Sequence, residues 1–239
     1  MSVGPCYLSD EFECCQTKYD ATRSVDLDTI SESVRVYVHA PHNMNVAKGW
    51  NMHLLREMIE MYERSIVHCG NGKSGGTILD TARYLSKMPM RKKHRLYIEN
   101  AAGQGNDLGA TWEEFRKLYE KLDSKYVDVC IDTQHSFASG LCNFSKPKQI
   151  LRLFDTAEDE IGGIQLIHLN DSMVEYGECK DRHETLGEGF IWSRSKRGLR
   201  CVLKACSDRN IDMIPETKTT LDDVRYCMKI MKSRKYRDR

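Results

Sequence analysis

The chain has 239 residues, of which 30% are charged and 40% hydrophobic, and its net charge at pH 7 is +1. This length is typical of one large globular domain, and no apolar run is long enough to predict a membrane span. The N-terminus lacks the basic start and apolar stretch of a secretory signal. The ten cysteines are therefore expected to be free thiols in an intracellular, reducing compartment.

Short apolar runs alternate with segments of helical spacing along the chain. The runs are rich in β-branched residues, which is typical of parallel strands buried on both faces. They are Val34–Ala40, Ser65–His68, Arg95–Asn100, Val127–Asp132, Ile164–Asn170 and Ile211–Glu216. Between them, Thr111 and Glu114 predict a capping box that opens a helix, and Pro147 predicts the first turn of another. Repeated strand–helix units favour an α/β fold, a TIM-type (β/α) barrel.

A potential metal ligand ends each of these six runs or stands close to the end. The six are His39, His68, Glu99, Asp132, His168 and Glu216. The first four intervals are 29, 31, 33 and 36 residues, each the length of one strand–helix unit, so the side chains are expected at one mouth of the barrel. The last interval is 48 residues and contains a loop that carries Asp181 and His183 back over the mouth, while His135 follows Asp132 by three residues.

A single strand-end histidine or carboxylate is ordinarily a satisfied polar residue or a helix cap. Six in phase with the strand–helix repeat, together with three on the adjoining loops, favour a metal cluster instead. Five imidazoles and four carboxylates exceed the four or so ligands of one zinc ion, so two or three ions are expected, with manganese or iron as alternatives to zinc. Metals about 3.5–4 Å apart activate water and neutralise a leaving alkoxide, which favours a phosphodiesterase or nuclease.

Five sequence blocks resemble the signatures of the endonuclease IV family, which are trinuclear zinc apurinic/apyrimidinic (AP) endonucleases on a TIM barrel. The blocks are VHAP (38–41), IENAAGQG (98–105), CIDTQHSFASG (130–140), HLNDS (168–172) and DRHETLGEG (181–189). The similarity runs from residue 34 to residue 217. It implies base excision DNA repair, in which the phosphodiester 5′ to an abasic site is hydrolysed to leave a 3′-hydroxyl and a 5′-deoxyribose phosphate. A 3′-phosphodiesterase or exonuclease activity can accompany this reaction.

The resemblance also implies a role for each candidate ligand. Overlapping groups would hold three zinc ions: His39, His68 and Glu99 the first, Glu99, Asp132, His168 and Glu216 the second, and His135, Asp181 and His183 the third. Glu99 and Glu216 are the implied catalytic carboxylates. The implied partner is double-stranded DNA containing abasic sites, bound by a monomer. Loops around the mouth are expected to contact this DNA through His42, Asn43, Gln104, Asn170 and Arg182.

The chain departs from the family at its N-terminus. The family has two strand–helix units before the strand that carries the first histidine ligand, whereas only 33 residues precede Val34. We therefore expect one domain over residues 1–228, divergent and shortened in 1–33, followed by a basic tail over 229–239. Within the shortened part, residues 12–17 are expected as a strand and 26–33 as a helix. The barrel is expected to be open or incomplete at the seam where these units are missing, unless residues 4–9 fill the gap.

Two other functions use some of the same residues. Xylose-isomerase-like sugar isomerases and epimerases place Glu, Asp, His and Glu at strand ends, which Glu99, Asp132, His168 and Glu216 match. Such an enzyme needs only one or two ions and leaves the other five candidate ligands without a role. A protein that binds damaged DNA without cutting it is the other alternative. A metal count and an incision assay separate the three functions.

Overall fold

The computed structural model describes residues 6–9, 35–41, 44–73 and 75–233. The predictions for residues 12–17 and 26–33 lie outside these residues, as do His42 and Asn43. Among the described helices, none combines the length and the apolar character needed to cross a membrane.

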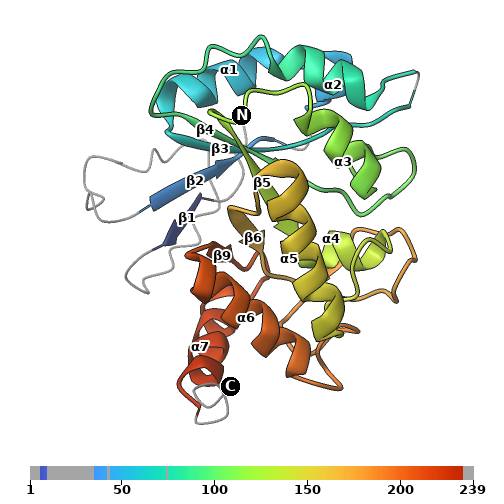
Figure 1. Cartoon of the computed structure of the whole chain (residues 1–239), viewed down its shortest axis with the longest axis vertical. Coiled ribbons are helices and arrows are strands. Elements are labelled where there is room, and N and C mark those ends of the chain that lie inside the picture. Colours follow the sequence, from blue (N-terminus) through green and yellow to red (C-terminus); the bar gives the residue numbers. More distant parts are fainter. Residues whose placement is uncertain (1–5, 10–34, 42–43, 74, 234–239) are drawn as a thin grey trace.

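Six parallel strands form a curved sheet that is an incomplete TIM-type barrel (Figure 1). In sheet order they are β2 (Arg35–His39), β3 (Arg64–His68), β4 (Arg95–Glu99), β5 (Val127–Asp132), β6 (Leu166–His168) and β9 (Asp212–Ile214). All six predicted strands are confirmed; β2 to β5 differ from the predicted bounds by at most one residue at either end, whereas β6 and β9 are shorter by four and three residues. A separate hairpin pairs β7 (Asp171–Ser172) with β8 (His183–Glu184).

The seam of the barrel differs from a regular parallel barrel. Strand β1 (Cys6–Ser9) pairs with the free edge of β2, but antiparallel, with Ser9 opposite Arg35. It also approaches β9, although no hydrogen-bonded ladder joins these two strands in the described part of the chain. The expectation that residues 4–9 help to fill the seam therefore holds for residues 6–9, in a direction that the sequence did not indicate.

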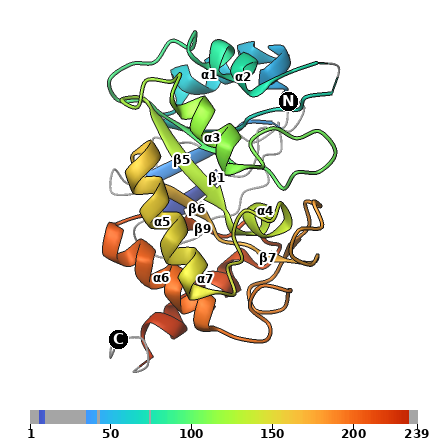
Figure 2. The ribbon, with the colours of Figure 1, turned by 45° about the vertical axis from the view of Figure 1, so that its right-hand side comes forward.

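Helices cover the outside of the sheet (Figures 1 and 2). They are α1 (Met52–Met61), α2 (Ile78–Leu85), α3 (Trp112–Tyr119), α5 (Pro147–Ile161), α6 (Arg197–Arg209) and α7 (Thr220–Met231). The short helix α4 (Thr133–Ala138) instead follows β5 directly at the mouth, and a 3-10 turn, η2, is at Val46–Lys48. Helix α7 contains the first three residues of the predicted basic tail, and residues 234–239 lie outside the described chain.

The predicted start of α3 is confirmed, but its capping interaction is only half of a capping box. Thr111 Oγ1 accepts the backbone N–H of Glu114 at 3.3 Å. The Glu114 carboxylate accepts the N–H of Gly109 at 3.2 Å and the Thr111 hydroxyl at 3.3 Å, rather than the backbone N–H of Thr111. The glutamate therefore ties the preceding loop to the helix. Pro147 opens α5 as predicted.

Every second residue of a strand faces the interior of the barrel, and these residues form three layers. The middle layer is a small apolar cluster of Tyr37, Ile66, Tyr97, Cys130, Leu166 and Ile214. Two positions earlier on each strand lies the base layer, which contains Arg35, Arg64, Arg95, Asp128 and Asp212. Two positions later lie the six strand-end ligand candidates. The remaining strand residues pack outward against the helices in the larger core.

Candidate metal centre

The sheet register brings the strand-end candidates together at the mouth. His68 pairs with Glu99 across β3 and β4, and Asp132 pairs with His168 across β5 and β6. Glu216 follows the end of β9 by two residues, so it continues the same inward face. Neighbouring strands lie about 4.8 Å apart, and paired residues on adjacent strands are therefore close enough to share a cation.

Glu99 is the centre of the cluster and is only 1% exposed. Its Oε2 lies 2.8 Å from His39 Nε2 and 3.6 Å from His68 Nε2. Its Oε1 lies 2.9 Å from His168 Nδ1 and 3.4 Å from His135 Nδ1. One carboxylate thus contacts four imidazoles, two on each oxygen, and it belongs to more than one candidate group of metal ligands.

A second group of donors shares His168 with Glu99. The Nδ1 atom of His168 is also 2.9 Å from Glu216 Oε2, and Glu99, Asp132, His168 and Glu216 form one group whose donor atoms lie within 4.8 Å of one another. The amide of Asn170 donates to Asp132 Oδ2 at 2.5 Å and to Glu216 Oε2 at 3.2 Å. Asp132 also caps α4, but with Oδ1, which accepts the His135 N–H at 2.8 Å. Its capping and ligand roles therefore use different oxygens.

The third group contains the residues of the inserted loop. The β7–β8 hairpin pairs Ser172 with His183 and so returns the chain to the mouth. His135 Nε2, His183 Nε2 and Asp181 Oδ1 form a nearly equilateral triangle with sides of 3.3, 3.4 and 3.4 Å. Asp132 Oδ2 lies 3.6 Å from His183 Nε2. Asp132 is thus placed between the second and third groups.

These separations fit a bound cation. Ligands about 2.1 Å from a tetrahedral zinc ion are roughly 3.4 Å from one another, which matches the triangle around His135. The histidine tautomers also fit, because Nδ1 of His39 lies 2.8 Å from the Ala40 carbonyl and Nδ1 of His135 lies 3.0 Å from the Asn100 carbonyl. An Nδ1–H held by a backbone carbonyl leaves the Nε2 lone pair free for a metal.

Without a cation the imidazoles and carboxylates shift each other's pKa. Burial raises the pKa of Glu99, but His168 and His68 outweigh burial and hold it well below its usual range. Burial also raises the pKa of Glu216, but its interactions, chiefly with His168, outweigh burial and lower this pKa to about 2. For His135, burial is outweighed by Asp132 and the other carboxylates, so its pKa is raised well above 6.5. Burial dominates at His68 and lowers its pKa to about 4.

The nine predicted ligands are therefore brought together. The predicted DNA contacts differ from one another in their exposure to solvent. Gln104 and Arg182 are exposed beside the mouth, and the Gln104 side chain accepts the N–H of Asp181 at 3.3 Å. Asn170, by contrast, is fully buried, and its amide holds Asp132 and Glu216 rather than facing solvent. The structure thus gives Asn170 the place of a positioning residue.

Two positioning residues were missed by the sequence reasoning. The Asn100 side chain accepts the N–H of Asp132 at 2.7 Å, and its backbone carbonyl contacts His135. Asp171 is fully buried and accepts the N–H groups of Ser172, Gly187 and Ile191, which fixes the loop that follows His183. Their only signal in the sequence was a polar residue one or three positions after a strand-end ligand candidate.

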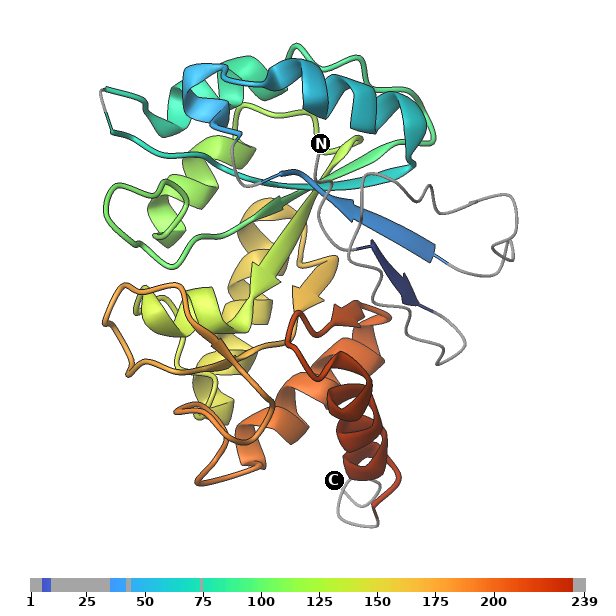
Figure 3. The same cartoon turned by 180° about the vertical axis from the view of Figure 1, so that it is seen from behind.

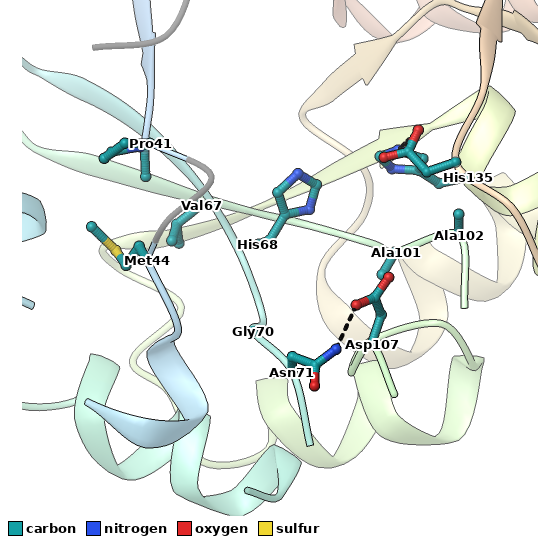
Figure 4. A pocket seen from close by; sticks show the side chains of 12 residues that line it. Pro41, Met44, Val67, His68, Gly70, Asn71, Ala101, Ala102, Asp107 and His135 are labelled. Carbon is teal, nitrogen blue, oxygen red and sulfur yellow. Dashed lines mark hydrogen bonds and ion pairs between the residues drawn. The ribbon is translucent and has the colours of Figure 1, made fainter. Parts of the chain in front are cut away.

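A cavity of about 190 Å³ opens beside the cluster (Figure 4). His68, His135 and Asp181 line it on the side of the cluster. The opposite wall includes Asn71, which donates to Asp107 Oδ1 at 2.9 Å. Much of the remaining lining is small, namely Ala40, Gly70, Ala101 and Ala102. Small walls leave room for a ligand directly against the candidate metal ligands.

The fold and the donor cluster define a class of protein. Residues 66–200 match the family model described as the xylose isomerase-like TIM barrel. Among solved structures, endonuclease IV from Thermus thermophilus is similar with a TM-score of 0.67 and 24% identity, over 84% of this chain and 75% of that chain. A D-tagatose 3-epimerase-like protein is similar with a TM-score of 0.59 and 20% identity, over 84% of this chain and 76% of that chain. These similarities show the fold.

Comparison with curated relatives identifies the family within this class. A probable endonuclease 4 from Natronomonas pharaonis is 32% identical over 91% of this chain and 71% of its own length. One from Campylobacter curvus is 38% identical over 54% of this chain, but the match spans only 44% of that relative. The chain belongs to the endonuclease IV family.

Proposed function

We propose that this protein is a metal-dependent endonuclease that hydrolyses the phosphodiester 5′ to an abasic site in double-stranded DNA. The observation that carries the proposal is the convergence of nine imidazole and carboxylate side chains in overlapping groups around Glu99 and Asp132. Its products are a 3′-hydroxyl and a 5′-deoxyribose phosphate, with trimming of blocked 3′ ends as a related activity. The monomer is the proposed active form.

We assign the nine residues to three divalent cations, with zinc as the preferred metal. Glu99 would belong to two of the sites, one with His39 and His68 and one with Asp132, His168 and Glu216. His135, Asp181 and His183 would hold the third ion. Bound at this centre, divalent cations supply a nucleophile at neutral pH and neutralise the charge that develops on phosphate and leaving oxygens.

The chain itself supplies orientation and space. Asn170 and Asn100 fix the carboxylates of Asp132 and Glu216 and the ring of His135, so that the donor atoms need little rearrangement when charge develops. The cavity beside His68 offers room for a deoxyribose without a base, next to the reacting phosphate. Extrusion of a nucleotide from a duplex costs least where the base is already missing.

An incision assay tests the proposal. We expect a duplex with one tetrahydrofuran abasic analogue to be cut once, 5′ to the analogue, by protein that contains three divalent ions per chain. Treatment with EDTA and the substitution Glu216→Gln each abolish the cut. The control substitution Glu175→Gln, which changes an exposed glutamate on the loop that carries Asp181 and His183, leaves the cut intact. Elemental analysis and size-exclusion light scattering on the same preparations give the metal content and the mass.

Two outcomes would overturn the proposal. An intact duplex together with three bound metals would make the chain a damage-binding protein. One or two metals, no cut and turnover of a ketose would favour the epimerase alternative, for which the similarity to the D-tagatose 3-epimerase-like fold is the supporting observation.

A further inference from the structure

Two exposed basic segments lie side by side on the outer rim of the mouth. We call their exposed cations the rim surface, which consists of Lys146, Lys148, Arg194, Lys196 and Arg197. Residues 143–154 and 189–207 contain no aspartate or glutamate. Within the described part of the chain, no ion pair joins Lys146, Lys148, Arg194 or Arg197 to a carboxylate. The fifth cation, Lys196, lies 4.8 Å from the centre of the Tyr226 ring. The rim surface is therefore a concentration of positive charge in which the other four cations form no ion pair with a carboxylate of the described residues.

Buried contacts hold the two segments together. The indole Nε1 of Trp192, which is fully buried, donates to the Phe144 carbonyl at 3.0 Å. Gly198 packs so closely that an added Cβ would lie 1.9 Å from the same oxygen. Cys201 Sγ lies 3.8 Å from the Pro147 carbonyl. The relative positions of the cations are thus fixed by packing, and Figure 3 shows the starts of α5 and α6 at the same end of the molecule as the β7–β8 loop.

The helices behind the rim surface add to its positive potential. Lys146 precedes the first residue of α5 and Lys196 precedes that of α6, and neither helix has an acidic residue in its first turn. Helices α2, α3 and α7 each have at least one. Because the N-terminal end of a helix is already positive, cations there are unfavourable unless an anion compensates them.

The rim surface is also close to the metal centre. Ile191 donates its N–H to Asp171 Oδ1 at 2.9 Å, and Asp171 directly follows the buried Asn170. Arg194 is three residues further along the chain, at most about 10 Å from Ile191. Glu184 and Glu188 line a hollow of about 220 Å³ together with Arg194. On a DNA strand with one phosphate per roughly 3.4 Å of helix axis, the span from Ile191 to Arg194 alone corresponds to about three nucleotides.

We infer that the rim surface binds backbone phosphates of the DNA duplex a few nucleotides away from the cleaved bond. This inference rests on the proposed function, because it treats the mouth as the place where DNA lies. The contacts are electrostatic and independent of base sequence. They extend the bound stretch of duplex beyond the nucleotide at the metal centre and hold it while the cavity receives the sugar.

The salt dependence of DNA binding tests the inference. We compare wild-type protein with the triple variant Arg194→Gln/Lys196→Gln/Arg197→Gln. The matched control is Arg91→Gln/Lys92→Gln/Lys93→Gln, which removes three exposed cations just before β4, at the opposite end of the strands. Binding of a lesion-free duplex is measured by fluorescence anisotropy between roughly 50 and 200 mM KCl, with metal-loaded protein. Incision of the tetrahydrofuran duplex is measured in parallel.

Each phosphate contact contributes about 0.9 to the slope of log affinity against log salt. We expect the rim variant to lose about 2 to 3 from this slope and to show a raised KM with kcat unchanged at saturating DNA, whereas the control keeps the wild-type slope. Equal slopes in all three proteins, with incision intact, would overturn the inference and leave the proposed function standing. If the rim variant has a reduced slope but the wild-type protein makes no incision, the inference stands and the proposed function is overturned. Equal DNA slopes with lost binding to phosphatidylserine vesicles would assign the surface to membranes instead.

Discussion

The mouth and the base of the barrel carry charged residues on the same strands, two positions on either side of one apolar layer. At the base, Arg35 pairs with Asp212 at 3.0 Å and Arg95 pairs with Asp128 at 3.2 Å. At the mouth, the carboxylates of Glu99 and Glu216 meet imidazoles instead. The two ends are alike in strand position and burial of their carboxylates, and they differ in the partner that each carboxylate has.

That difference decides which end can hold a metal. Arginine stays protonated and has no lone pair to donate, so a carboxylate paired with it is already neutralised. A neutral imidazole offers a lone pair, and several carboxylates around it supply the negative charge that a divalent cation compensates. The carboxylates at the base are thus already neutralised by arginines, whereas those at the mouth lie among lone-pair donors in overlapping groups.

The largest expected effect comes from the centre of the mouth. Glu99→Gln removes the charge that four imidazoles share, so we expect incision to fall by about a thousandfold or more, together with the loss of at least one bound ion. Single-turnover incision and elemental analysis measure the two effects. If the variant keeps wild-type rate and metal content, Glu99 is not a bridging ligand.

An intermediate effect concerns pH. The pKa values of His135 and His168 are raised above 6.5, so in metal-free protein their protonated rings stabilise the fold fully below the unfolded pKa, and this stabilisation is lost as pH rises through the raised folded values. A metal must displace those protons. We expect EDTA to lower the Tm little at about pH 5.5 and by about 10 °C at about pH 8. A decrease in Tm that is the same at both pH values would contradict this.

The smallest effect is expected at the base. Asp212→Asn weakens the pair with Arg35 and leaves a hydrogen-bond acceptor for the Tyr37 hydroxyl. We expect the free energy of unfolding to fall by about 1–2 kcal/mol, with metal content and kcat unchanged. Urea unfolding with parallel incision assays measures this. A loss of metal from this variant would show that the two ends of the barrel are coupled, and the comparison between them would fail.

The strand-end pattern explains how much could be predicted. His39, His68, Glu99 and Asp132 recur with the strand–helix repeat, and in a parallel barrel equivalent strand positions must converge. Local order in the sequence was therefore enough to place most of the cluster at one mouth. The inserted loop was predicted by its excess length, and the hairpin of β7 and β8 confirms that it returns to the mouth.

Other features depended on contacts between residues distant in sequence. The burial of Asn170, the antiparallel direction of β1 and the pairing of Arg35 with Asp212 each join segments whose local patterns do not refer to one another. A strand pattern specifies which face a side chain takes but not which partner lies across the interior. Adjacent basic segments such as 146–148 and 194–197 are likewise visible as a single surface only when the packing of α5 on α6 is known.

The sequence by itself determined the family, the barrel and the nine side chains at its mouth, because periodic strand ends and contiguous blocks are local properties of the chain. Tertiary structure alone decided how those side chains share oxygens and rings, which amides hold them, and how the base of the barrel balances its charges. The physical reason is that a carboxylate becomes a metal ligand or half of an ion pair according to the neighbour that packing places within about 3 Å of it.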